Sequence, residues 1–250
     1  MSKEVYRTRD AQGEIIVRES AGRRIMDFGS GLEQSNLLMN RPWQLTHEYT
    51  KIMLLGLVFN NARHITLAGL GGGGLLHCIA HFFPQIEIQV VELRQAVIDV
   101  ACEWFDLPRE SCINIACCDA YVYLKEQRSE KTDLILSDLY NATQMSDVQA
   151  QRRFIEVAHA SLNEEGWLVI NFHQLPDSDS EVMQQIRAMF AVVYVYDVSV
   201  GNRILFCGKG SEEDEWGIVL DRYSAQAREL GRALGLPLLY YFRLLRAANI

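Results

Sequence analysis

The chain has 250 residues, with 24 Lys and Arg against 32 Asp and Glu, so its formal net charge at pH 7 is −8. Hydrophobic residues make up 49% and charged residues 22%, which is typical of a folded chain with a sizeable core and excludes a disordered one. The acidic balance argues against nucleic acid as a partner, because phosphate contacts need a Lys and Arg surface. It favours a cationic or neutral small molecule.

We expect neither a signal peptide nor a membrane-spanning segment. The first ten residues, MSKEVYRTRD, lack the apolar stretch of a signal peptide. The longest apolar run, 52–59, is too short to span a bilayer, so we expect no membrane partner. The six cysteines show no C-x-x-C spacing, although Cys117 and Cys118 are adjacent. Free thiols in a reducing cytoplasm are the simplest interpretation, and we expect a cytoplasmic protein.

The first part of the chain predicts two small units. Apolar residues recur at alternating positions up to about residue 40, with turn signals at Gln12-Gly13 and Ala21-Gly22, so residues 1–42 are expected to form an N-terminal β-strand region. From residue 43 to 60, apolar residues recur at steps of three and four, which predicts a helix with one apolar face. We assign residues 43–250 to a single α/β domain.

From His64 onward, predicted strands and helices alternate. Nearly continuous apolar runs are typical of strands buried on both faces of a parallel sheet. Such runs occur at 64–69, 86–92, 113–118, 132–138 and 166–172, and helical segments are predicted at 74–83, 94–105, 120–127, 149–162 and 178–190. This order predicts an open sheet with helices on both faces.

Two further strands, 192–198 and 203–208, are joined by a link too short for a parallel crossover, so they must form an antiparallel hairpin. The predicted fold class is therefore α/β: a doubly wound, mostly parallel, seven-stranded sheet with an antiparallel final hairpin. Terminal helices are expected over 221–247, broken at Gly235-Leu236-Pro237.

A glycine-rich loop follows the first of these strands, where ligands of open α/β sheets bind. It runs Gly69-Leu70-Gly71-Gly72-Gly73-Gly74 and opens a helix. Glycines let the backbone turn tightly and let a ligand approach the amides at the helix N-terminus. The string satisfies G-x-G-x-x-G. A strained turn without a ligand is the alternative, but the position between a buried strand and a helix favours a nucleotide-type ligand.

Acidic residues end the next three strands. Glu92 stands where a ribose diol is usually bound, and a solvated carboxylate paired with Arg94 is the alternative. Asp119 faces the predicted cleft, or caps the helix that begins at Ala120, or does both. Asp138 is expected to be partly desolvated and then needs a partner or a cationic ligand; a cap or turn role is the alternative. Three acids without a basic group to hold a diphosphate favour a positively charged adenosine over a dinucleotide.

The run from Gly69 to His173 resembles the class I S-adenosylmethionine-dependent transferases and, more narrowly, the spermidine synthase (polyamine aminopropyltransferase) family. The resemblance is carried by ITLAGLGGGGLL, IQVVELRQAVIDVACEWF, INIACCDAYVYL, DLILSDLYNATQM and RRFIEVAHASLNEEGWLVINFH, with LEQSNLLMNRPWQLTHEYTKIM before them. It implies the Rossmann-like methyltransferase fold, S-adenosylmethionine or its decarboxylated form as cofactor, and an amine or another small molecule as substrate. We also expect a homodimer.

The resemblance implies roles for individual residues. The glycines of the loop would line the methionine-like tail of the cofactor, Glu92 would bind the ribose hydroxyls, and Asp119 with Ala120 would bind the adenine. Gln34 would touch the ribose or the sulfur region. The implied cofactor-binding set is thus Gln34, Gly69, Gly71, Gly73, Glu92, Asp119 and Ala120.

The same resemblance implies which residues would act on the substrate. Asp138 would be the catalytic acid–base residue, and Tyr49 would aid the amine substrate. Tyr140 and Asn141 would contact that substrate. No metal is expected, because His77 and His81 are four residues apart on a predicted helix with no third ligand nearby.

The sequence departs from the family in three places. Family members carry G-G-G-D-G-G in the loop, and that acid holds the ammonium of decarboxylated S-adenosylmethionine; here the loop has only glycines and Leu70. A second family acid, three residues after the catalytic one, is replaced by Asn141. Tyr49 is followed by Thr50-Lys51 where the family tends to be acidic, and a Lys there opposes a polyamine.

Four functions therefore remain open. The first is aminopropyl transfer to an amine. The second is methyl transfer from intact S-adenosylmethionine to a small molecule, which the acid-free loop favours. The third is a non-catalytic cofactor binder. The fourth is a nicotinamide dehydrogenase, suggested by the G-x-G-x-x-G string but opposed by the antiparallel final hairpin and by Asp119.

Overall fold

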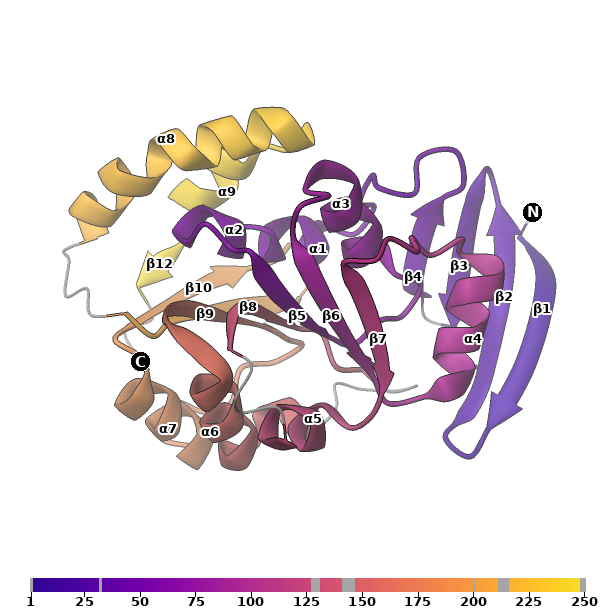
Figure 1. Ribbon diagram of the computed structural model, residues 1–250, viewed down its shortest axis with the longest axis horizontal. Coiled ribbons are helices and arrows are strands. Elements are labelled where there is room, and N and C mark those ends of the chain that lie inside the picture. The colour runs from indigo at the N-terminus through magenta and orange to yellow at the C-terminus, as the bar shows by residue number, and fades with distance from the viewer. Residues whose placement is uncertain are drawn as a thin grey trace.

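The computed structural model describes residues 2–31, 33–126, 131–140, 147–199, 201–210 and 216–247, with side chains described except at 147 and 216–222. Within these ranges the chain forms two sheets, one of four strands and one of eight. Figure 1 shows the smaller sheet standing beside the larger one, with helices above and below the larger sheet.

The N-terminal sheet is an antiparallel meander in the order β1-β2-β3-β4. Its strands are β1 (Lys3–Asp10), β2 (Gly13–Ser20), β3 (Arg23–Asp27) and β4 (Glu33–Leu38). The predicted turns at 12–13 and 21–22 join β1 to β2 and β2 to β3. Apolar side chains of this sheet pack on helix α4 (Gln95–Trp104), so the short strands are stabilised by burial against the rest of the chain. The division into two domains at residue 42 stays a prediction.

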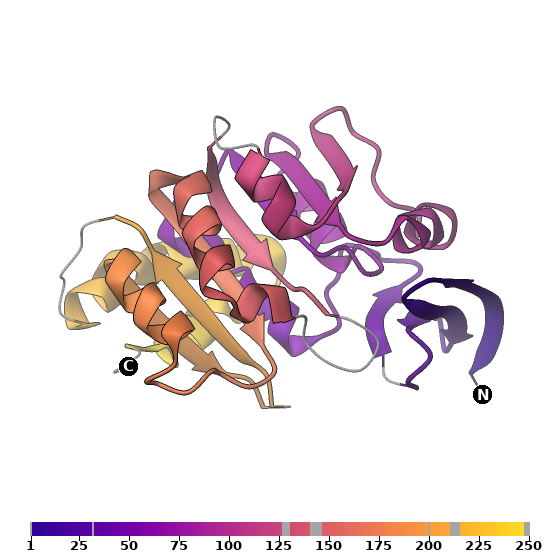
Figure 2. The same ribbon diagram turned by 90° about the horizontal axis from the view of Figure 1, so that it is seen from below.

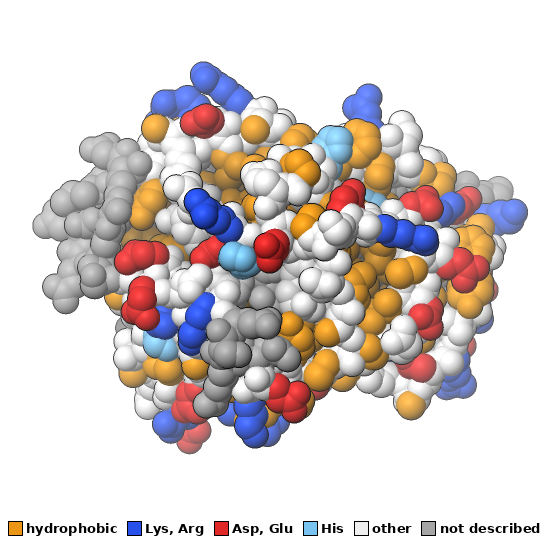
Figure 3. Space-filling view, viewed as in Figure 1, with side chains coloured by type: hydrophobic (Ala, Val, Ile, Leu, Met, Phe, Trp, Pro, Cys, Tyr) orange, Lys and Arg blue, Asp and Glu red, His pale blue; other side chains and the backbone are white. Residues whose placement is uncertain are grey.

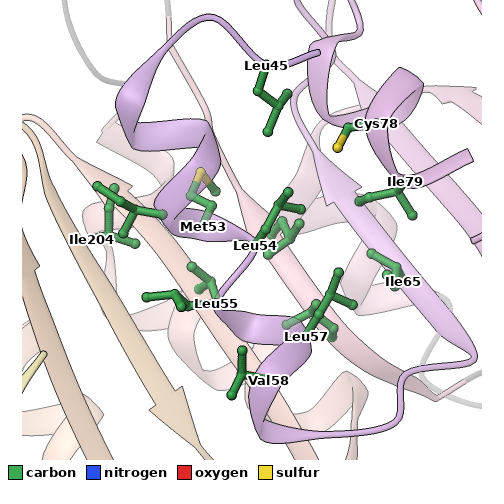
Figure 4. Close-up of a cluster of buried hydrophobic side chains, with 14 of the residues drawn as sticks. Leu45, Met53, Leu54, Leu55, Leu57, Val58, Ile65, Cys78, Ile79 and Ile204 are labelled. Atoms are coloured by element: carbon green, nitrogen blue, oxygen red, sulfur yellow. The ribbon is translucent and has the colours of Figure 1, made fainter. Parts of the chain in front are cut away.

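The single helix predicted over 43–60 is two short helices instead, α1 (Glu48–Met53) and α2 (Gly56–Phe59). Residues 52–59 are all buried: Met53, Leu54, Leu55 and Val58 have no exposed surface, and Figure 4 shows them among side chains of neighbouring elements. At Gly56, a Cβ atom would lie 2.9 Å from Leu134 and Val169. The backbone therefore lies directly on the sheet, and no single apolar face exists.

The larger sheet has the order β12-β10-β11-β9-β8-β5-β6-β7. Its parallel part consists of β5 (His64–Ala68), β6 (Glu87–Glu92), β7 (Ile113–Cys117), β8 (Thr132–Ser137) and β9 (Leu162–Phe172). The chain starts at β5, proceeds outward to β6 and β7, and returns to β8 on the other side of β5. This reversal is the switch point at which open α/β sheets bind ligands.

The antiparallel end of the sheet confirms the predicted hairpin. β10 (Val192–Asp197) pairs with β11 (Arg203–Gly208), and β11 pairs with β9. An eighth strand, β12 (Arg246–Ala247), pairs with β10 where only helix was predicted. Two paired residues leave no apolar periodicity in the sequence, so this strand could not be foreseen.

Helices cover both faces of the larger sheet, which confirms the doubly wound class. Figures 1 and 2 show α1, α2, α3 (Gly74–Phe82), α8 (Trp216–Leu234) and α9 (Leu238–Arg243) on one face, and α5 (Ala120–Glu126), α6 (Arg152–Ser161) and α7 (Glu181–Met189) on the other. A short 3-10 helix, η1 (Asp147–Ala150), precedes α6. Each face has its own apolar cluster.

The end of the chain follows the predicted break. Gly235 ends α8 with a φ of +65°, and α9 begins after Pro237. No helix among the described residues combines the length and the apolar character that a membrane crossing requires. On the face shown in Figure 3, Lys and Arg side chains are interspersed with Asp and Glu and form no single basic patch.

Candidate cofactor and acceptor site

A cavity of about 410 Å³ lies at the switch point, where the carboxyl ends of β5, β6 and β8 meet β4 and the segment before α1. Parallel strands bring their carboxyl ends to one edge, so residues far apart in the sequence gather there. Most of the predicted site residues line this cavity: Gln34, Tyr49, Gly69, Gly71, Glu92, Asp119, Ala120, Asp138 and Tyr140.

One predicted site residue is placed differently, and another cannot be assessed. Gly73 does not line the cavity: it is the residue before α3 and has a φ of +77°, and a Cβ there would lie 2.3 Å from Leu107. Its position requires glycine for packing and backbone conformation, and its predicted contact with the cofactor stays a prediction. Asn141 lies outside the described residues.

The glycine loop is held by hydrogen bonds from both sheets. The Leu70 N–H donates to Glu92 Oε2 at 3.0 Å, and the Gly72 N–H donates to Ser35 Oγ of β4 at 2.7 Å. At Gly69, where φ is +99°, a Cβ would lie 2.3 Å from the backbone oxygen of Asp138. The loop therefore passes directly against the backbone that carries Asp138, and only glycine permits this approach.

Gly72 stands at the fourth place of the loop, where the family pattern has its acid. A Cβ at this position would lie 2.8 Å from the Phe105 ring and 3.0 Å from the Ser35 Cβ. Any side chain at this position would therefore have to displace the Phe105 ring or Ser35.

Glu92 is 9% exposed at the end of β6. Its two carboxylate oxygens accept the N–H groups of Leu70 at 3.0 Å and of Arg94 at 2.9 Å. Burial raises the pKa of Glu92, and these hydrogen bonds oppose the rise. Each oxygen keeps a further lone pair, so hydroxyl donors of a ribose can still bind.

The Arg94 side chain does not pair with Glu92, so this alternative for Glu92 is wrong. The Arg94 guanidinium binds Asp10 through two hydrogen bonds of 2.9 Å and lies 4.8 Å from the centre of the Phe28 ring. This ion pair ties α4 to the N-terminal hairpin and neutralises the arginine beside the cavity.

Asp119 both caps a helix and faces the cavity, as the sequence allowed. Its Oδ1 accepts the Val122 N–H at 3.1 Å, which is the helix-capping geometry, and the residue also lines the cavity. Ala120 beside it is 5% exposed and also lines the cavity.

Asp138 follows β8 and is half-buried at the floor of the cavity. Its Oδ1 accepts the side-chain amide of Asn171 at 2.8 Å, and the Tyr49 hydroxyl donates a second hydrogen bond. Burial raises the pKa of Asp138, while these two hydrogen bonds oppose the rise. Burial and the nearby Asp138 charge raise the pKa of Tyr49, so its hydroxyl stays a donor at neutral pH.

Three residues of this site were missed from the sequence. Asn171, 1% exposed in β9, and Asn202, just before β11, line the cavity behind Asp138. Gln149 of η1 is fully buried and binds Ser137 Oγ and the Asn171 backbone oxygen, both at 2.8 Å. The one available signal was Asn171, a polar residue near the end of the apolar run WLVINF.

The charges around the cavity are mainly negative. Its described lining residues include four carboxylates: Glu33, Glu92, Asp119 and Asp138. Arg94 is the only Lys or Arg among them, and Asp10 neutralises it. Burial lowers the pKa of His47, which also lines the cavity, so it is neutral at pH 7. In the part of the chain that the structure describes, no cluster of His, Cys, Asp and Glu could hold a metal.

A doubly wound sheet with a glycine loop after its first strand, an acid at the end of the second and an antiparallel final hairpin defines the fold of the class I adenosyl-sulfonium-dependent transferases. Residues 46–200, more than half of the chain, match the family model of the spermine/spermidine synthase domain. The chain belongs to this family. It is therefore a transferase, and the nicotinamide dehydrogenase is no longer an alternative.

Similar proteins agree with this family. A polyamine aminopropyltransferase of Neisseria meningitidis is 27% identical over 241 residues, which cover 94% of this chain and 90% of that protein. One of Chromobacterium violaceum is 30% identical over 165 residues, 65% of this chain and 63% of that protein. An eEF1A lysine and N-terminal methyltransferase of Xenopus laevis is 25% identical over 72% of this chain, but over only 29% of its own length.

Solved structures share the fold. A probable spermidine synthase from Corynebacterium glutamicum has a TM-score of 0.73 at 21% identity, covering 91% of this chain and 87% of that chain. Human methyltransferase-like protein 13 in complex with SAH has a TM-score of 0.64 at 22% identity, covering 77% of this chain and 94% of that one. One fold thus occurs in proteins named as aminopropyl and as methyl transferases.

Proposed function

We propose that this protein transfers an aminopropyl group from an adenosyl-sulfonium cofactor to an amine. The observation that carries the proposal is the position of Asp138: a carboxylate bound only by neutral donors among the described residues, on the floor of a cavity that also contains the glycine loop and Glu92. The aminopropyltransferase relatives in two bacteria support the same reaction.

The cavity suits a positively charged nucleoside. Glu92 has free acceptor capacity for ribose hydroxyls, and Asp119 with Ala120 stands where the adenine would lie. Gln34, Gly69 and Gly71 line the same cavity and would contact the sulfur region and the tail. A bound sulfonium supplies an electrophilic carbon next to its positively charged sulfur. The carboxylates around the cavity attract that charge.

The acceptor amine must be neutral when it reacts. An alkylammonium with a pKa of about 10.4 is neutral in only about one molecule in a few thousand at pH 7. A carboxylate alone stabilises the ammonium and so does not create the free amine. Asp138 therefore acts by positioning the amine and by accepting its proton as the new C–N bond forms and the C–S bond breaks, which leaves a neutral thioether. Tyr49 and Tyr140 line the same cavity and would contact the acceptor.

Methyl transfer from intact S-adenosylmethionine is the second candidate, and Gly72 favours it. No carboxylate stands in the loop to pair with an ammonium or to repel the cofactor's own carboxylate, and Phe105 and Ser35 lie within 3.0 Å of where a Cβ at Gly72 would be. The same reaction geometry at Asp138 would then deliver a methyl group to a small nucleophile.

The deciding experiment offers the protein each cofactor form separately with a panel of mono- and diamines and analyses the products by mass spectrometry. Aminopropyl transfer predicts methylthioadenosine and an amine heavier by one aminopropyl unit, obtained only with the decarboxylated cofactor. Methylated product with intact S-adenosylmethionine would establish the second candidate. Calorimetry with both forms completes the test, since tight binding without any product would indicate a non-catalytic binder.

The assembly and the location form part of the same proposal. We propose a homodimer in the cytoplasm, and light scattering of the purified protein tests the dimer directly. A monomeric mass at micromolar concentration would contradict it.

A further inference from the structure

Among the described residues, the partners of Asp138 are neutral hydrogen-bond donors, and no Lys or Arg side chain contacts it. Asn171 and Tyr49 donate to the carboxylate, and the arginine nearest in the described cavity lining, Arg94, is bound to Asp10 instead. A Lys or Arg beside Asp138 would stabilise its charge more strongly, but it would also repel a positively charged ligand. Neutral donors stabilise the carboxylate and leave the negative field of the cavity intact.

Such stabilisation depends on which way the Asn171 amide points. If the amide were turned by 180°, its oxygen would face the Asp138 carboxylate and the hydrogen bond would become a repulsion. Asn202 prevents this, because its Nδ2 donates to the Asn171 Oδ1 at 2.9 Å. The second N–H of Asn202 is directed to the Tyr140 hydroxyl oxygen at 3.3 Å. The donors therefore run in one direction, from Asn202 through Asn171 to Asp138.

Asn171 is also held from its backbone. Its carbonyl oxygen accepts the Gln149 side-chain amide at 2.8 Å, and Gln149 is fully buried. Asn202 is fixed by the hairpin, where its carbonyl oxygen accepts the Val198 N–H at 2.8 Å. The backbones that carry both amides are thus held by hydrogen bonds of the fold, and the side chains are oriented by their bonds to each other and to Asp138.

We propose that Asn171 and Asn202 are positioning residues, which hold Asp138 ionised and oriented through a chain of neutral amides so that the site keeps its attraction for a cation. Neither amide takes part in bond making. The role deepens the proposed function, because it concerns the acid on which that function rests, but it can be measured on the protein alone.

The measurement is the titration of Asp138, followed by NMR in protein labelled with carboxyl-¹³C aspartate and assigned from the signal that disappears in Asp138→Asn. Asn171→Leu removes the donor and keeps a side chain that branches at Cγ. The expected result is an upward shift of the Asp138 midpoint by about one pH unit, the size of one lost hydrogen bond to a charged group. The other titratable or charged side chains that line the cavity must be followed in the same series: Glu33, His47, Tyr49, Glu92, Arg94, Cys118, Asp119, Tyr140 and His173.

A matched control exists on the same two strands. Asn163 of β9 donates its side-chain amide to Asp133 of β8, at the opposite end from the cavity. Asn163→Leu removes an Asn-to-Asp hydrogen bond of the same kind and should leave the Asp138 midpoint unchanged. An equal shift in Asn163→Leu, or no shift in Asn171→Leu, would overturn the proposal.

Asn202→Ala provides an independent test should Asn171→Leu fail to fold. It leaves the Asp138 donor in place but frees the Asn171 amide to turn, so a smaller upward shift of the same sign is expected; an unchanged midpoint would overturn the role of Asn202. In active protein, the acidic limb of the kcat/KM profile should move with the NMR midpoint. The titration needs no turnover, so it stands or fails separately from aminopropyl transfer, which the product assay decides.

Discussion

The two ends of strand β8 carry the same pair of side chains in different surroundings. The amino-end pair is Asp133 with Asn163, and the carboxyl-end pair is Asp138 with Asn171. In the amino-end pair the carboxylate also accepts the backbone N–H groups of Arg63 at 2.8 Å and His64 at 3.0 Å. Hydrogen bonds within the protein thus use the acceptor capacity of the Asp133 carboxylate.

The carboxylate of the carboxyl-end pair accepts fewer hydrogen bonds from the fold. Asp138 has only the Asn171 amide and the Tyr49 hydroxyl as partners among the described residues, and it faces the cavity. The comparison teaches that residue type does not separate a structural acid from a chemical one. The number of donors that the fold supplies, and the space left beside them, make the difference.

The largest expected effect separates the two acids by activity. Asp138→Asn keeps the shape of the side chain but cannot accept the amine proton, so we expect kcat/KM to fall about 10²- to 10⁴-fold, the usual contribution of a general base. Cofactor binding by calorimetry should persist. Asp133→Asn serves as the control and should retain activity, so comparable activity losses in both variants would remove the distinction.

A second effect follows from the close approach of the loop to the carboxyl-end pair. Gly69→Ala places a methyl group against the Asp138 backbone oxygen at a φ that alanine avoids, and we expect a loss of about 2–4 kcal/mol in the free energy of unfolding. Urea denaturation measures it. Gly201→Ala is the matched control, since Gly201 also has a positive φ (+102°) but no atom within 4 Å of the added Cβ. Gly201→Ala should lose less free energy of unfolding, because only the unfavourable φ and no steric clash destabilises it.

Next in size is the stability contribution of the amino-end pair. In Asp133→Asn, the amide that replaces one carboxylate oxygen cannot accept all of the N–H groups that point at it, so we expect a loss of about 1–3 kcal/mol in the free energy of unfolding. Chemical denaturation of both proteins at pH 7 tests this. An unchanged midpoint would mean that water replaces these bonds at no cost.

The smallest effect is a difference in sign between the pH dependences. Burial raises the pKa of Asp133, but its hydrogen bonds outweigh burial and lower it overall, so its stabilisation is present above the unfolded-state pKa and is lost as pH falls through the folded one. The pKa of Asp138 is raised, so its ionisation opposes folding at neutral pH, and that penalty is relieved as pH falls through the raised value. Unfolding of both Asn variants between pH 3 and 7 should therefore give stability differences of opposite sign at neutral pH that converge in acid.

Much of the fold and the positions of the three site acids could be predicted from the sequence, because buried apolar runs show where strands end. Buried apolar runs located β5 to β9, and the residues that follow them located Glu92, Asp119 and Asp138 in one place. The fold class, the family and the enzyme class are confirmed. The individual roles of the site residues stay predictions, since placement in a cavity does not measure a role.

The rest depended on contacts that no local pattern encodes. Asn171 meets Asn202 because β9 and β11 pair in one register, with Ile204 opposite Asn171, and a shift of one residue would separate them. The helix expected over 43–60 is interrupted at Leu54 and Leu55, and Gly56 beside this break lies against the sheet, a contact that sequence spacing cannot reveal.

The ion pair between Arg94 and Asp10 has a consequence for how the molecule can be taken apart. Asp10 belongs to the first hairpin, yet it cancels the charge of an arginine that lines the ligand cavity next to Glu92. A truncated protein starting at α1 would expose that guanidinium to the incoming sulfonium. The amino-terminal hairpin is thus an electrostatic shield for the cavity, and grafting it from another protein would succeed only if the graft carried an acid at the same spot.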